Sequence, residues 1–442
     1  MKIIFCILVI ILLQNCSFDN KSGIWKNSSE EIKKTSENFK DFKKIVLENE
    51  NFFNEIIDID KDFKFFLTKP LSPTKWNDFF FDSNNINANF SFSDKNKIIF
   101  RSGKLSRNKV SNNILFNRDL LITSDSKGNI IVYSLELKKI LHKYNFYKKK
   151  IKNIEKKLYY ILDDSLLYVS DNIGYLYAYN FIENDIIWAK KFDAPFRSNL
   201  KADSKKLFLA DENNNLFIVD IKNGNILRKI PSEEVLIKNN FENNVAINKT
   251  DLFFLNNFGS LYSVNKDSLK INWFVNVNTS VESNIEKLFT SNEIHIFDDN
   301  LIISTDNILQ VLSNQYGSTK FKIPISSRIS PIINKDYIFI VSNNNLLISI
   351  QISTGKIIYS YEINQLISDY LNSKKKKINV NLIRLINSQI YVFLNNSFVI
   401  KFNVNGEIID IFKLPKKIYS NPIFIENSLI YLDNKNKIII LN

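Results

Sequence analysis

Acidic side chains that recur at turn positions are the first candidates for chemistry in this sequence. Asp125, Asp171 and Asp211 each stand between two apolar runs. Carboxylates gathered in loops could hold calcium, which prefers oxygen ligands. Asp and Asn also favour tight turns, because their short side chains hydrogen-bond to backbone groups two residues on. Since these residues return at the same place in successive repeats, we interpret them as hairpin residues and predict no metal site.

The remaining polar residues do not form a recognisable catalytic set. His142 and His295 are the only histidines, and each lies in or beside an apolar run without a second metal-type ligand at a useful spacing. We interpret both as structural or surface residues. The acid pairs at 163–164 and 298–299 fall in predicted turns. The sequence has nine glycines and lacks both a Gly-x-Ser-x-Gly motif and a glycine-rich phosphate loop. We therefore predict no catalytic residue, no cofactor and no enzymatic activity.

A unit of apolar run, polar turn and second apolar run repeats along the chain. Successive turns are 37 to 52 residues apart, which is room for about four short strands. The runs are rich in Ile, Leu, Val, Phe and Tyr, and many are continuous, as in strands covered on both faces. We predict an all-β fold, an eight-bladed β-propeller. The turn positions are Asp125, Asp171, Asp211, Asn256, Asp306, Asn343, Asn395 and Asp433.

The ends of the chain bear on how this ring closes. The last repeat, residues 421–442, has room for about three strands. We predict that residues 96–100 supply the missing strand and so join the two ends of the ring. Closure would remove exposed sheet edges, which otherwise invite aggregation. The fifth and seventh repeats are the weakest, so a seven-bladed ring is the alternative.

The N-terminus has the features of an export signal. Lys2 precedes an apolar run at 3–13, which is too short to span a bilayer and fits a secretory signal peptide. The run ends at Leu13-Gln14-Asn15-Cys16, which resembles the lipobox of bacterial lipoproteins. That resemblance implies a lipidated, palmitate-bearing Cys16; an ordinary signal peptide with an incidental cysteine is the alternative. We expect a lipoprotein signal peptide at 1–15, a lipid-anchored tether at 16–89 and the propeller at 90–442.

The chain is basic, with a formal net charge of +13. An Asn-, Lys- and Ile-rich composition accounts for this charge; a basic face for anionic lipid or an acidic partner is the alternative. No nucleic-acid-binding motif accompanies the charge, so we predict no nucleic-acid partner. The run Lys374–Lys377 is interpreted as a solvated loop, with an anionic contact as the alternative.

Parts of the repeat resemble the quinoprotein type of propeller. The stretch 352–359, with its Thr-Gly-Lys turn, is similar to that repeat, in which a following Trp docks between blades; Trp188 and Trp273 occupy the matching position in their own repeats. This resemblance implies one of two families. The first is the pyrroloquinoline-quinone-dependent dehydrogenases, which commonly carry a vicinal disulfide that this sequence lacks.

The second family is the outer-membrane protein assembly factor BamB, a lipoprotein of the machinery that assembles β-barrel proteins. The layout of signal, lipobox, tether and eight degenerate blades resembles it, and so does the Pro- and Trp-containing stretch 69–76. The resemblance implies a non-enzymatic scaffold on the periplasmic face of the outer membrane. Its partners would be the periplasmic domains of the central barrel subunit and unfolded outer-membrane proteins. A propeller lipoprotein that binds another protein or a glycan is a further alternative.

The same resemblance directs attention to the connections between early and middle blades as partner-binding loops. The stretch 193–197 falls in such a connection. Phe196 and Arg197 are our candidate anchor pair, because aromatic and Arg residues dominate interface hot spots. The alternative is that residues 195–197 simply enter the innermost strand of the next blade.

Overall fold

The computed structural model describes residues 52–148, 151, 153–203, 205–233, 241–278 and 289–442, and the backbone of 16–18 and 25–27. It divides into two separate units, residues 1–51 and 52–442. In the first unit, β1 (Cys16–Phe18) and β2 (Trp25–Asn27) pair antiparallel. The expected signal peptide at 1–15 lies outside the described residues. No described helix is long and apolar enough to cross a membrane.

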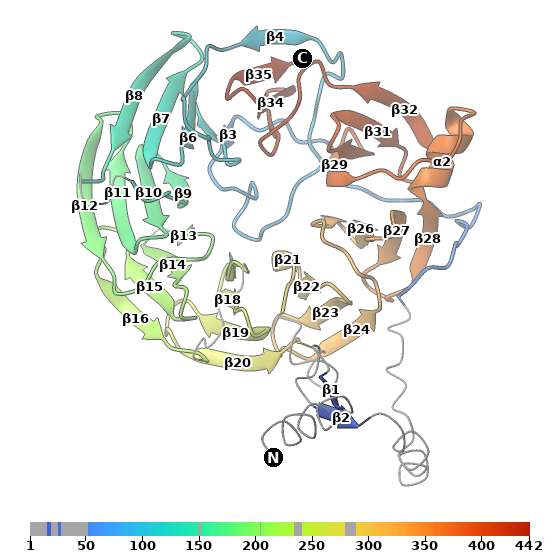
Figure 1. Ribbon diagram of the computed structural model, residues 1–442, viewed down its shortest axis with the longest axis horizontal. Coiled ribbons are helices and arrows are strands. Elements are labelled where there is room, and N and C mark those ends of the chain that lie inside the picture. Colours follow the sequence, from blue (N-terminus) through green and yellow to red (C-terminus); the bar gives the residue numbers. More distant parts are fainter. Residues whose placement is uncertain are drawn as a thin grey trace, which may run out of the picture. The chain divides into compact units, whose positions relative to one another are not determined.

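The second unit is a ring of antiparallel sheets around a central channel (Figure 1). Its described strands form eight sheets, so the predicted eight-bladed β-propeller is confirmed and the seven-bladed alternative is wrong. Each predicted turn position lies at the end of the second strand of its repeat or within two residues after it, counting blade 1 from the strand at 115–117 and blade 8 from the strand at 423–425. The single described helix is α2 (Ile363–Tyr370), between blades 6 and 7.

The blades are built from consecutive strands that run in order from the channel outward, except that β4 (Ile98–Arg101) belongs to blade 8. Blades 1 to 4 comprise β3 (Lys75–Trp76), β5 (Leu115–Asn117), β6 (Leu120–Ser124), β7 (Asn129–Ser134) and β8 (Lys139–Asn145); β9 (Leu158–Asp163), β10 (Leu166–Asp171), β11 (Tyr175–Asn180) and β12 (Asp185–Lys191); β13 (Lys201–Asp203), β14 (Lys206–Ala210), β15 (Leu216–Asp220) and β16 (Ile226–Ile230); β17 (Asn244–Ile247), β18 (Asp251–Leu255), β19 (Ser260–Asn265) and β20 (Ile271–Asn276).

The other four blades follow the same order. Blades 5 to 8 comprise β21 (His295–Phe297), β22 (Asn300–Ser304), β23 (Leu309–Ser313) and β24 (Thr319–Ile323); β25 (Ile332–Asn334), β26 (Tyr337–Val341), β27 (Leu346–Gln351) and β28 (Ile357–Glu362); β29 (Val380–Ile386), β30 (Gln389–Leu394), β31 (Phe398–Phe402) and β32 (Ile408–Lys413); β33 (Ile423–Ile425), β34 (Ser428–Leu432), β35 (Ile438–Leu441) and β4 (Ile98–Arg101).

Position in the blade explains the two kinds of strand sequence. Every residue of β6 is buried, because neighbouring blades cover both of its faces. The outermost strand β12 alternates exposed and half-buried residues, because one of its faces meets solvent. Buried clusters lie between blades: Leu176 and Ala178 of blade 2 share one with Leu207 and Leu209 of blade 3. The core is therefore a series of inter-blade layers around the ring.

Residues from the two ends of the second unit close the ring. The strand β4 pairs antiparallel with β35, with Phe100 opposite Ile440 and Ile98 opposite Leu441. The predicted closing strand at 96–100 is therefore confirmed within two residues. This pairing completes blade 8, because β4 covers the edge of β35 that would otherwise be unpaired. It also holds both ends of the repeat region in one sheet.

In blades 2, 4, 5 and 6, an aromatic residue of the outermost strand docks on the next blade. The indole Nε1 of Trp188 donates to the carbonyl of Ile221 in the following blade at 3.1 Å. Its ring covers Gly224, where an added Cβ would lie 2.6 Å from a ring carbon. Gly224 also has a φ of +72°, which L side chains rarely adopt. Trp273 repeats the arrangement over Gly317, so this part of the repeat is an inter-blade contact.

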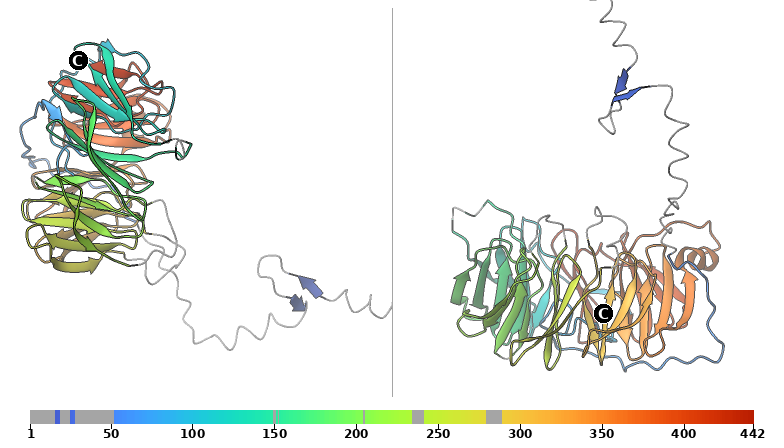
Figure 2. Two further views of the ribbon diagram at one scale, coloured as in Figure 1. Left: turned by 90° about the vertical axis from the view of Figure 1, so that its left-hand side faces the viewer. Right: turned by 90° about the horizontal axis from the view of Figure 1, so that it is seen from below.

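Residues 52–74, which we name the strap, run along the outside of blade 6 and then across one face of the ring (Figure 2). Ile57 exchanges two backbone hydrogen bonds with Ser360 of β28, at 3.1 and 2.9 Å. Further on, Phe65 packs against Tyr337, and the carbonyl of Pro73 accepts the amide hydrogen of Glu426 at 3.0 Å. The structure therefore differs from the expected tether at 16–89: its second half, from residue 52, is part of the ring unit.

Candidate functional site: a central funnel closed at one end

The channel of the ring forms a funnel with a volume of about 970 Å³. Its walls come from the start of innermost strands and from the connections that lead into them, such as residues 155–160 and 241–244. Asp78, Phe79 and Phe80 also line it. We call the side of the ring that carries these inter-blade connections the connection face. The side that carries the turns between first and second strands is the opposite face.

Residues 77–92, which we name the plug, close the channel toward the opposite face. Figure 1 shows this part of the chain crossing the middle of the ring. Backbone amides at or just beyond the ends of the innermost strands donate to plug carbonyls in blades 2, 4, 5 and 7. These bonds are Leu162 to Asn77 (2.9 Å), Ile247 to Ser83 (3.0 Å), Ile296 to Asn84 (3.0 Å) and Asn387 to Phe90 (2.8 Å). The plug thus takes up inward-facing strand edges that would otherwise be unpaired.

A buried ion pair fixes the start of the plug. Lys201 of β13 has no exposed surface, and its Nζ lies 2.6 Å from Oδ2 of Asp78. The same Nζ donates to the carbonyl of Asp82 at 3.1 Å. Burial of the Asp82 carboxyl raises its pKa to about 6, although the amide of Ile86 and the charge of Lys201 favour the ionised form. No sequence pattern indicates this set, because Asp78 and Lys201 are 123 residues apart and belong to no repeat.

Two further polar side chains lie under the plug. Nδ1 of His295 is 2.6 Å from the carbonyl of Asn85, and burial lowers the pKa of the imidazole. Burial also lowers the pKa of Arg384 to about 10, against the opposing effect of Glu293. Asn85 itself donates to the carbonyls of Val245 and Ile294. His295 is therefore a structural residue that helps to hold the plug.

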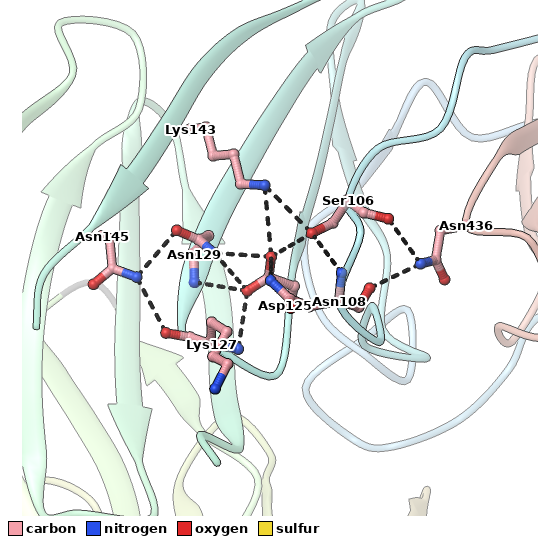
Figure 3. A network of polar contacts seen from close by, with 8 residues as sticks. All are labelled: Ser106, Asn108, Asp125, Lys127, Asn129, Lys143, Asn145 and Asn436. Carbon is pink, nitrogen blue, oxygen red and sulfur yellow. Dashed lines mark hydrogen bonds and ion pairs between the residues drawn. The ribbon is translucent and has the colours of Figure 1, made fainter. Parts of the chain in front are cut away.

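The repeated turn carboxylates bond the amides of their own hairpins, and Figure 3 shows Asp125, which also contacts residues outside its hairpin. Oδ1 of Asp125 accepts the amide hydrogens of Lys127 and Asn129, at 3.0 and 3.1 Å, and Oδ2 accepts the hydroxyl of Ser106 at 2.6 Å. Burial opposes ionisation of Asp125, but these hydrogen bonds outweigh it and lower the pKa. Asp171 and Asp211 bond their own turns in the same way. Among the described residues, no group of three or more metal-type ligands comes together.

The two predicted partner-binding residues occupy different environments. Phe196 is 1% exposed and packs edge-on against Phe192 and Phe217 inside the cluster between blades 2 and 3. It therefore cannot present its ring to a partner, and the alternative interpretation of 195–197 as the entry to blade 3 describes it better. Arg197 is half-buried. Burial, and to a smaller extent the charge of Arg197, lowers the pKa of Lys157 on the connection face. Cys16 begins β1, and its side chain lies outside the described part of the structure.

Comparisons with known proteins agree with this architecture. Residues 155–361 match the family model described as outer membrane protein assembly factor BamB. The crystal structure of BamB from Moraxella catarrhalis is similar at a TM-score of 0.61 and 15% identity, over 78% of this chain and 98% of that one. The computationally designed protein Ika8 is similar at 0.58 and 8% identity, over 78% and 99%. No curated protein matches the chain. The resemblance to BamB suspected from the sequence is therefore confirmed, and the low identities to solved structures show the fold alone.

Proposed function

We propose that this chain is a non-enzymatic scaffold that takes part in assembling and inserting β-barrel proteins into the outer membrane. The match of residues 155–361 to the BamB family model carries the proposal. The eight-bladed ring, whose channel ends in a plug of its own chain, is compatible with a binding role. A rigid ring holds its connecting loops in fixed positions, which lowers the ordering cost of binding a partner.

The proposed location is the periplasmic face of the outer membrane, with lipid on Cys16. The motif at 13–16 supports the anchor. Metabolic labelling with palmitate is expected to mark the chain, and Cys16→Ser is expected to abolish the label while Cys6→Ser affects neither label nor export. Export of an unlabelled soluble protein would remove the anchor from the proposal.

The proposed partner is the central barrel subunit, through its periplasmic domains, with unfolded outer-membrane proteins as clients. Arg197 is the candidate contact that remains, since it lies where an early connection reaches the connection face. Purification of the tagged chain from its own cells in mild detergent is expected to recover a large β-barrel protein with periplasmic repeats. Arg197→Glu is expected to weaken this recovery, and Lys249→Glu, on the opposite face, to leave it unchanged. Recovery of no such protein by the unaltered chain would refute the assembly role.

The competing proposal is a quinoprotein-like dehydrogenase, because such enzymes are built from the same type of repeat as the matching family model. Such an enzyme binds pyrroloquinoline quinone with calcium. We expect the two together to leave the unfolding temperature of the chain unchanged, with calcium alone as the control. A saturable rise with the quinone would favour the enzyme over the scaffold.

A further inference from the structure

The helix α2 and the loop after it lie between two blades and form an exposed surface. They occupy the connection between β28 and β29, at the outer edge of the ring (Figure 1). The start of the helix is anchored, because Ile363 is fully buried and Leu366 packs on the core of blades 6 and 7. From Asp369 to Lys377, by contrast, every residue is exposed.

This exposed stretch combines apolar and basic side chains. Tyr370 is 46% and Leu371 is 52% exposed, and Ile409 of the neighbouring strand β32 is 42% exposed beside them, since its carbonyl accepts the hydroxyl of Tyr370 at 3.3 Å. The four lysines of 374–377 follow directly. We name residues 370–377 with Ile409 the rim patch.

The charge of the rim patch is only partly balanced within the ring. Residues 362–379 contain four lysines and two acids. Lys375 pairs with Glu362 at 2.5 Å, and Asp369 accepts a hydrogen bond from Gln365. Among the described residues, no ion pair joins Lys374, Lys376 or Lys377 to an acid. Three cations thus remain available to an anionic surface next to an exposed Tyr and Leu.

The described ring unit begins at the outer edge of blade 6, the blade that precedes this patch in the chain. Phe53 donates its amide hydrogen to the carbonyl of Pro324, in the connection that precedes blade 6, at 2.8 Å. Ile57 pairs with Ser360, three residues before α2 begins. Any anchor on the preceding residues would therefore reach the ring at blade 6, which is next in the ring to the connection that carries the rim patch. Such tethering raises the effective concentration of a weak surface contact.

We propose that the rim patch is a membrane-docking surface that binds anionic phospholipid headgroups. Tyr370 and Leu371 would enter the interface between headgroups and acyl chains, where amphipathic and apolar side chains are favourable. The lysines would lie over the headgroups and add an attraction that salt screens. The proposal extends the proposed function, but its test depends on neither the lipid nor the assembly partner.

The test uses the full chain with Cys16→Ser, so that lipid on this cysteine does not contribute, and liposome co-sedimentation. Binding to vesicles that contain phosphatidylglycerol is expected to exceed binding to pure phosphatidylcholine and to fall with salt. Replacing Lys374–Lys377 by Gln is expected to lower the partition coefficient about 100-fold, since each of the three lysines other than Lys375, which pairs with Glu362, contributes roughly fivefold near an anionic surface. Leu371→Ser is expected to reduce it several-fold on the same vesicles.

The matched control removes the same charge from the opposite face. Lys205, Lys222, Lys249 and Lys335 are exposed there, and their joint replacement by Gln is expected to leave vesicle binding within about twofold. All variants should keep the unfolding temperature of the parent. Equal loss in both quadruple variants would show that only total charge matters, and would overturn the proposal. Lysine-dependent binding of polyglutamate without binding to vesicles would overturn it in favour of an acidic protein partner.

Discussion

Replacing Asp82 by Asn is predicted to make the protein more stable at neutral pH. Asp82 lies in the plug, where burial raises the pKa of its carboxyl from 3.8 to about 6. At pH 7 the folded protein therefore contains an ionised group in a poorly solvated place. Asn removes the charge and keeps Oδ1, the atom that accepts the amide hydrogen of Ile86 at 2.9 Å.

The rise of the Asp82 pKa from 3.8 to about 6 sets the size and the sign of the change in stability. One unit corresponds to about 1.4 kcal/mol, so burying the charged form costs about 3 kcal/mol above pH 6. Between pH 4 and 6 the folded state binds more protons than the unfolded state, so Asp82 lowers the free energy of unfolding as pH rises. The attraction to Lys201 is already contained in the raised pKa, but the Asn amide group that replaces one carboxylate oxygen needs a hydrogen-bond acceptor of its own, which subtracts from the gain. We expect Asp82→Asn to raise the free energy of unfolding by about 2 kcal/mol at pH 7 and by almost nothing near pH 4.

Urea unfolding of both proteins, followed by circular dichroism from pH 4 to 7.5, measures this effect. Other carboxyl groups alter both curves alike, so the difference between the two proteins isolates Asp82. Asp60→Asn is the control, because Asp60 is exposed on the strap. A difference that does not change with pH would contradict the reasoning, and so would a variant less stable than the parent at pH 7.

Three further perturbations test the ring and the plug. Lys201→Met leaves Asp78 buried without its partner and is expected to lower the free energy of unfolding in urea by about 3–5 kcal/mol. The double variant that adds Asp78→Asn is expected to recover part of this loss, and no recovery would contradict the pairing. Gly224→Ala places a Cβ against Trp188 at a φ of +72° and is expected to lower stability by about 1–3 kcal/mol, whereas the same change at Gly103, which has open space, should cost little. Asp211→Ala removes the acceptor of two turn amides and is expected to cost about 1–3 kcal/mol, and addition of calcium to the parent should not change its unfolding temperature.

Local patterns in the sequence were sufficient to predict the ring. The turns at Asp125 and Asp171 could be predicted from neighbouring residues, because each carboxylate accepts the amide hydrogens two and four positions further along the chain. Closure by residues near 98 was predictable as well, because the last repeat is one strand short. These features depend on spacing and composition within about 50 residues.

The plug could not be predicted, because its partners are distant in sequence and follow no period. Asn85 bonds to Val245 and Ile294, which are 160 and 209 residues away. Residue type also misled the site prediction at Phe196, since an aromatic residue beside Arg occurs in hot spots and in cores alike. Only the packing of Phe192 and Phe217 around it separates the two cases.

If the rim patch docks on a bilayer as proposed, the plug and the rim patch together orient the ring. Because the plug closes the channel toward the opposite face, a partner that reaches the funnel must come from the connection face. In a ring of eight blades, the connection between blades 6 and 7 lies across from the one between blades 2 and 3 (Figure 1). The first carries the rim patch, and Arg197 is in the second. A ring that meets the bilayer at α2 therefore keeps Arg197 on the far side of the channel, where a periplasmic partner could reach it and the lipid could not.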